Sequence, residues 1–138
     1  MIGYVTLGAD DIAAARRFYT GFLPALGYSL SEGPEGLSFE LPVAGGQRPV
    51  HPDLYIKQTF NGAPASAGNG TMVAFDARRQ AQVRALHAEA LAAGGTYEGA
   101  PGFRADYSPE FFVGYLRDPQ GNKIALYSND PAEPRRGD

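Results

Sequence analysis

The side chains that could take part in proton transfer or metal binding are carboxylates, phenols and two histidines. The sequence contains no cysteine. Disulfides, thiolate nucleophiles and cysteine-ligated metal sites are therefore excluded. Ionisable and aromatic residues concentrate in the segment Arg104–Glu110. In a proton transfer without a metal, Glu40 or Glu110 could act as the base. Tyr4 or Tyr115 could act as the acid, and the spacing of these residues does not single out one pair.

The two histidines have ordinary explanations. His51 lies in a proline-rich loop, where we expect an exposed polar side chain. His87 follows Val83 by four residues and precedes Leu91 by four, which places it on the inner edge of a predicted helix. We expect His87 to be packed and hydrogen-bonded, and neither histidine to be a metal ligand.

Length and charge exclude several classes of protein. A chain of 138 residues fits one domain. The net charge of −3 provides no basic face, so we expect no binding of nucleic acid. No apolar run approaches the roughly 20 residues that span a bilayer, and the first residues lack the pattern of a secretory signal. These features predict a cytoplasmic protein that does not bind membranes.

The predicted elements occur in the same order twice. In the first half, a strand over 2–7 precedes a helix capped by Asp10 or Asp11 and ending within 20–23, and strands follow over 28–32, 37–41 and 53–57. In the second half, a strand over 70–75 precedes a helix over 77–93. A short strand over 96–98, a loop over 99–109, and strands over 111–116 and 123–128 follow. The last two strands are joined by a tight turn over 117–122, which contains Pro119 and Gly121.

The two halves also align at an offset of 68 residues, which matches Tyr4 with Met72 and Gly27 with Gly95. Together with the repeated order, this alignment indicates an α+β fold of two tandem βαβββ modules. Neither module has two layers of its own, so each needs the other to cover its sheet. We expect a single domain over 1–129, with module one over 1–60, module two over 68–129, and a disordered tail over 130–138.

Six segments, in their order along the chain, carry a family resemblance. They are residues 4–19, 24–28, 68–75, 86–95, 99–104 and the turn with its following strand, 117–124. This set resembles the vicinal oxygen chelate superfamily, which contains glyoxalases, bleomycin-resistance proteins and extradiol dioxygenases. The resemblance implies a cup-shaped mixed sheet around a pocket, with the helices outside, and a homodimer.

The resemblance also implies where metal ligands would lie. Metal-dependent members place a histidine on the first strand of each module and a glutamate on the last strand. These positions correspond to Tyr4, Met72 and Ala125. A fourth carboxylate position corresponds to Lys57, or to Tyr55 if the loops differ in length. Neutral phenol, thioether, methyl and ammonium groups do not provide the imidazole or carboxylate donors that divalent ions need, so we expect no metal cofactor.

The expected pocket suits a small, largely apolar or aromatic organic ligand. The candidate pocket residues are Tyr4, Thr6, Lys57, Met72, Arg104, Tyr107, Tyr115 and Ala125. The first hypothesis is a metal-free protein that binds such a ligand. The alternatives are an enzyme, either a lyase or isomerase of glyoxalase type or a dioxygenase-like protein, and an interaction domain whose cup is filled by its own side chains.

Overall fold

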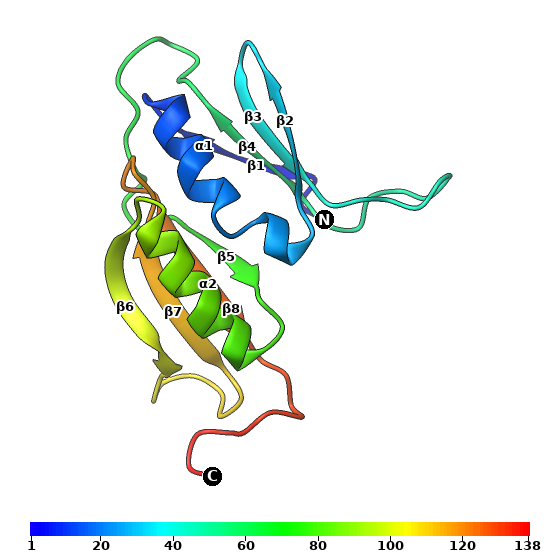
Figure 1. Cartoon of the computed structure of the whole chain (residues 1–138), viewed down its shortest axis with the longest axis vertical. Coiled ribbons are helices and arrows are strands. Elements are labelled where there is room, and N and C mark those ends of the chain that lie inside the picture. Colours follow the sequence, from blue (N-terminus) through cyan, green and yellow to red (C-terminus); the bar gives the residue numbers. More distant parts are fainter.

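The computed structural model describes residues 1–138 and contains eight strands, two α-helices and a short 3₁₀-helix (Figure 1). The first module comprises β1 (Tyr4–Gly8), α1 (Ile12–Thr20), the 3₁₀-helix η1 (Pro24–Leu26), β2 (Ser29–Gly33), β3 (Gly36–Glu40) and β4 (Asp53–Lys57). The second comprises β5 (Met72–Asp76), α2 (Gln80–Ala92), β6 (Thr96–Phe103), β7 (Phe112–Arg117) and β8 (Lys123–Ser128). The predicted α+β fold of two βαβββ modules is confirmed.

Each module forms its own open four-stranded sheet. The strand order is β1-β4-β3-β2 in the first sheet and β5-β8-β7-β6 in the second. The first strand of each module pairs in parallel with the last, and the other pairs are antiparallel. The mixed sheet expected from the resemblance is thus divided into two halves of identical topology.

The helices cover one face of each sheet. Figure 1 shows α1 over the first sheet and α2 over the second, on the same side of the molecule. Their C-terminal ends meet, since Arg17 Nη2 donates a hydrogen bond to the backbone oxygen of Ala92 at 3.2 Å. One apolar core runs beneath both helices, and the rings of Phe22 and Phe75 join the two modules within it at 5.7 Å.

Helix α1 begins directly after an aspartate whose side chain accepts a hydrogen bond from a free amide in the first turn of the helix. The Asp11 side chain accepts a hydrogen bond from the Ala14 amide at 3.0 Å, so Asp11 is the N-cap. The neighbouring Asp10 instead accepts a hydrogen bond from the Ala65 amide at 2.8 Å, which ties the inter-module segment to the helix start. Of the two predicted caps, the structure therefore selects Asp11.

Helix α2 begins at Gln80 rather than at the predicted residue 77. Arg78 has a φ of 67°, the one positive φ outside glycine, and this left-handed conformation cannot belong to a right-handed helix. The Gln80 amide donates a hydrogen bond to Glu133 Oε2 at 2.7 Å, so the cap of α2 comes from the C-terminal tail. Glu133 also accepts a hydrogen bond from Ser128 Oγ at 3.1 Å.

The other bounds lie within two residues of the predictions except at β6. That strand extends to Phe103, although its sequence predicts a strand only over 96–98. Two shifts of register, near Gly99 and Gly102, keep it paired with β7 despite its glycines and proline. The predicted tight turn forms between β7 and β8, where the Asp118 amide donates to the backbone oxygen of Asn122 at 2.9 Å.

Neither helix is long and apolar enough to cross a membrane.

Candidate functional site

Alternate residues of each strand point away from the helices and form what we call the open face of its sheet. Val5 and Leu7 of β1 pack toward the core, so Tyr4 and Thr6 lie on the open face of module one. Alternation likewise places Lys57 of β4 on the same face. In module two, Met72, Tyr115 and Ala125 occupy the corresponding face. All six predicted pocket residues on strands therefore lie on the open faces.

The open face of module one carries an aromatic pair flanked by charge. The rings of Tyr4 and Tyr55 lie 5.3 Å apart, and Lys57 Nζ lies 5.4 Å from the centroid of the Tyr55 ring. Lys57 pairs with Glu35 at 2.9 Å. Burial raises the pKa of Tyr55, and its hydrogen bond to Asp53 at 3.2 Å raises it further. Tyr55 is thus a neutral phenol whose hydroxyl donates the hydrogen bond to Asp53.

The open face of module two centres on Tyr115. The Arg104 guanidinium lies 5.3 Å from the Tyr115 ring centroid and Lys123 Nζ lies 5.0 Å from it, so two cations contact one ring. Burial raises the pKa of Tyr115, which keeps its hydroxyl neutral. This arrangement brings Arg104, which follows β6, to the same face as the strand residues.

A row of three rings, one pair stacked and one pair edge-on, continues this face toward the β6–β7 loop. The ring of Phe111 lies 5.5 Å from Tyr127, in a stacked arrangement, and 5.4 Å from Tyr107. The loop is held in place by the tail, because Arg136 donates a hydrogen bond to the backbone oxygen of Tyr107 at 3.2 Å. The predicted residue Tyr107 thereby joins module two's half of the candidate site.

The two halves remain separate within one chain. The ring contacts, ion pairs and hydrogen bonds join candidates within a module, as between Lys123 and Tyr115, and none joins a candidate of module one to one of module two. Tyr4, Met72 and Ala125 were predicted to surround a single pocket. Within one chain they lie on two separate sheets, Tyr4 on the first and Met72 and Ala125 on the second. We call the open face of each sheet a half-site.

Comparison with known proteins decides the family. A sequence model of the glyoxalase/bleomycin resistance protein/dioxygenase superfamily matches residues 1–126. The chain belongs to this superfamily. A glyoxalase/bleomycin resistance protein from Albidiferax ferrireducens shares 32% identity and a TM-score of 0.79, with 94% of this chain and 99% of that chain covered. No curated protein sequence gives a significant match.

More distant superfamily members share the fold. A glyoxalase-related enzyme from Fulvimarina pelagi has 22% identity and a TM-score of 0.69, covering 94% of this chain and 88% of that chain. A fosfomycin resistance protein, FosX, from Listeria monocytogenes has 12% identity and a TM-score of 0.66, covering 95% and 94%. At these identities the likeness concerns the fold alone.

Strand register identifies the fourth ligand position of the superfamily. Ala125 lies opposite Ala74, two residues after Met72. In module one, the residue opposite Thr6, two residues after Tyr4, is Tyr55. Lys57 lies opposite Gly8, one pleat farther along the strand. The register therefore favours Tyr55, the alternative, over Lys57 for this position.

The side chains at these four positions do not fit a divalent ion. Tyr4 and Tyr55 are phenols, Met72 offers a weak thioether donor, and Ala125 offers no donor. The structure contains no group of three or more His, Cys, Asp or Glu side chains that could hold a metal ion. We therefore assign no chemical step to a metal at these positions.

The remaining predicted groups have structural partners. His87 is buried, and its Nε2 lies 2.9 Å from the backbone oxygen of Tyr115, which confirms its packed, hydrogen-bonded position. Glu110 pairs with Arg135 at 3.4 Å. Glu40 accepts a hydrogen bond from Ser38 at 3.3 Å. Each carboxylate therefore has one oxygen in a structural contact.

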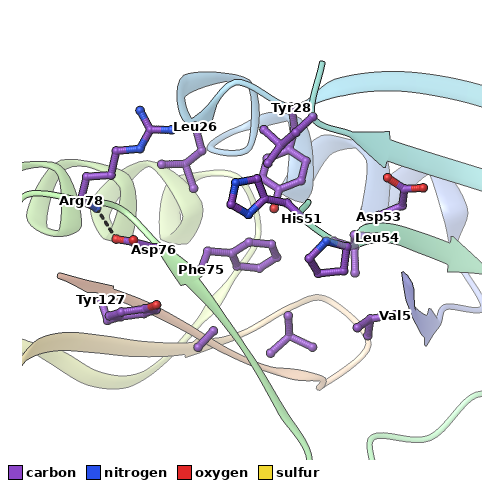
Figure 2. Close-up of a pocket in the computed structure, with 14 residues that line it drawn as sticks. Val5, Leu26, Tyr28, His51, Asp53, Leu54, Phe75, Asp76, Arg78 and Tyr127 are labelled. Atoms are coloured by element: carbon purple, nitrogen blue, oxygen red, sulfur yellow. Dashed lines mark hydrogen bonds between the residues drawn. The ribbon is translucent and has the colours of Figure 1, made fainter. Parts of the chain in front are cut away.

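A cleft at the junction of the modules was not predicted. It has a volume of about 310 Å³ and is lined by Val5 and Leu54 of the first sheet and by Phe75 of the second (Figure 2). Its polar lining includes His51 and Arg78. None of the eight predicted pocket residues lines it. No local pattern in the sequence relates the residues around 51–54 to those around 73–78, because only the packing of the modules brings them together.

Proposed function

We propose that the protein binds a small, largely apolar or aromatic organic molecule on its open faces through side chains alone. The observation that carries this proposal is the exposure of large apolar side chains there. Tyr4 is 65% exposed, Tyr107 53% and Met72 44%. Exposed aromatic and thioether groups, here Tyr4 on one half-site and Met72 and Tyr107 on the other, are typical of recognition surfaces.

The charges on the open faces favour a ligand with an anionic edge. Lys57 is neutralised by Glu35, and Arg117 is held by Glu98 through two contacts of 3.1 Å. Arg104 and Lys123, in contrast, form no ion pair. A planar ligand could stack on the aromatic rings of this face while its anionic group pairs with these two cations.

We further propose that a second copy of the chain completes the site. Each chain carries two half-sites whose candidate residues do not contact each other, and both halves are open. If one chain placed its module-two face over the module-one face of its partner, the rings of both halves would enclose one ligand. A symmetric dimer would then contain two equivalent sites.

Binding of the fluorescent aromatic anion 8-anilinonaphthalene-1-sulfonate tests this proposal. We expect saturable binding, and an increase in stability of about 2.7 kcal/mol at about 100 times its Kd. Tyr4→Ala and Met72→Ala should each weaken binding. Phe60→Ala is the matched control, because Phe60 is a fully exposed aromatic residue in the loop after β4.

Two results would overturn the proposal. One is binding that Tyr4→Ala and Met72→Ala weaken no more than Phe60→Ala does. The other is turnover of a hemithioacetal or a catechol by the purified protein, which would establish the enzymatic alternative. Sedimentation equilibrium tests the second copy separately, since a monomer that binds the anion with full affinity would contradict only the dimer.

A further inference from the structure

The cleft between the modules has the composition of a second binding site. Its volume of about 310 Å³ lies at the lower end of the range for small-molecule pockets. Figure 2 shows Phe75 at its centre, Arg78 and Asp76 together at one end, and Asp53 at the other. None of the eight predicted pocket residues lines the cleft, and Tyr127 alone belongs both to its lining and to the row of rings described above. Asp76, Arg78 and Phe75 carry the inference, and the proposed function does not use them.

The middle of the cleft is apolar. Phe75 is buried and packs edge-on against Tyr28, with ring centroids 6.1 Å apart. Leu26 and Leu54 line the same space. An apolar or aromatic side chain of a ligand would lose contact with water here, and such burial provides most of the affinity of small apolar groups.

One end of the cleft is lined by two residues of opposite charge, Asp76 and Arg78. Asp76 Oδ1 accepts a hydrogen bond from the Arg78 amide at 2.7 Å, while Oδ2 of Asp76 has no partner. The Arg78 guanidinium forms no ion pair. A carboxylate oxygen and a guanidinium are therefore both available to a ligand at this end of the cleft.

The backbone around Arg78 is held in an unusual conformation. Its φ of 67° is unfavourable for a residue with a Cβ, and its backbone oxygen accepts a hydrogen bond from Ser128 Oγ at 2.8 Å. Strained residues that the surrounding structure over-determines concentrate at binding sites. At Arg78, the hydrogen bond from Ser128 holds this strained backbone in place at the rim of the cleft.

The charges distinguish between classes of ligand. A simple anion on Arg78 would leave the carboxylate of Asp76 without a partner, and a simple cation on Asp76 would leave Arg78 without one. A molecule that carries an ammonium and a carboxylate on the same carbon atom can pair with both side chains. We propose that the cleft binds a free α-amino acid with an apolar or aromatic side chain, its carboxylate on Arg78 and its ammonium on Asp76.

Titration calorimetry with L-phenylalanine tests the proposal, together with amide chemical shifts. We expect binding with shifts at Val73–Asp76. L-phenylalanine amide lacks the carboxylate, and N-acetyl-L-phenylalanine lacks the ammonium. Each should bind at least about tenfold more weakly, since each loses one charge-assisted hydrogen bond.

Matched variants separate the site from general effects of charge. Arg78→Gln removes the charge and, like arginine, places a residue with a Cβ at the positive φ. Asp76→Asn removes the charge but keeps a side-chain oxygen that can accept the hydrogen bond from the Arg78 amide. Both should weaken L-phenylalanine binding by about tenfold or more, whereas Arg79→Gln, one residue outside the cleft, should leave it unchanged. Tyr4→Ala should also leave it unchanged, which distinguishes this site from the open faces.

The proposal is overturned if L-phenylalanine causes no shifts at millimolar concentration. It is equally overturned if both modified forms bind as well as the free amino acid, or if Arg78→Gln has no larger effect than Arg79→Gln.

Discussion

The hydroxyl of Tyr19 donates a hydrogen bond of 2.6 Å to Oδ2 of Asp118, and both residues are buried. Tyr19 belongs to α1 of the first module, and Asp118 belongs to the β7–β8 turn of the second. The same carboxylate accepts hydrogen bonds from the Asn122 side chain and amide, each at 2.9 Å. Asn122 in turn donates to the backbone oxygen of Gly8 at 3.0 Å. This buried network fixes the relative position of the two modules, and with it the cleft between them.

Removal of the Tyr19 hydroxyl should destabilise the protein. Tyr19→Phe leaves a buried carboxylate with one fewer donor, and a hydrogen bond to a charged group contributes about 1.5–3 kcal/mol. Urea unfolding should show a lower midpoint with an unchanged m-value. Tyr4→Phe is the control, since Tyr4 is exposed and its hydroxyl makes no hydrogen bond. Equal stability of the two variants would contradict a structural role for the Tyr19–Asp118 bond.

Alkaline pH should weaken the fold through the same residue. Burial raises the pKa of Tyr19 well above its ordinary value of 10.0, and the charge of Asp118 adds to the shift. The folded protein therefore retains a proton that the unfolded chain releases above about pH 10, so the free energy of unfolding falls as the pH rises beyond that point. Unfolding curves between about pH 8 and about pH 11 should show a steeper decline for the native chain than for Tyr19→Phe. Parallel declines would show that other groups cause the alkaline loss.

The C-terminal tail should contribute to stability although its sequence predicts disorder. Glu133 places a carboxylate at the N-terminus of α2, where an acceptor and a negative charge are both favourable. Glu133→Ala should cost about 1 kcal/mol and accelerate hydrogen exchange of the Gln80 amide. Glu89→Ala serves as the control, because Glu89 is exposed and forms no ion pair. An unchanged exchange rate at Gln80 would contradict the capping role.

Introducing imidazole and carboxylate donors should create a metal site at the positions that the family resemblance implies. The native protein should melt at the same temperature with and without a chelator, whereas Tyr4→His, Met72→His and Ala125→Glu together should bind Zn²⁺ or Ni²⁺. Because the two halves of the site do not meet within one chain, metal binding should also increase dimer formation in sedimentation experiments. A folded triple variant that binds neither ion would show that these positions are wrongly assigned.

Local sequence predicts the elements whose own residues determine them. The alternation in Asp53–Lys57 predicts that strand at its observed bounds, because one of its faces is buried. The strand over Lys123–Ser128 also has its predicted bounds, since the tight turn before it fixes where it begins. Asp11 lies three residues before the amide that it caps, so the start of α1 follows from neighbouring residues. The order of these elements and the six segments that resemble the superfamily are also sufficient to indicate it.

Tertiary structure decided the features that depend on residues far apart in the chain. The start of α2 depends on Glu133, 53 residues away, and the length of β6 depends on its pairing with β7. The choice of Tyr55 over Lys57 required the register between β1 and β4, since a shift along a strand moves every side chain. By itself, the sequence determined the modules and the residue types on their open faces, because periodicity and capping act over a few residues. The separation of the faces into two halves and the cleft beside Arg78 arise only when the modules pack, because packing joins surfaces that no local pattern relates.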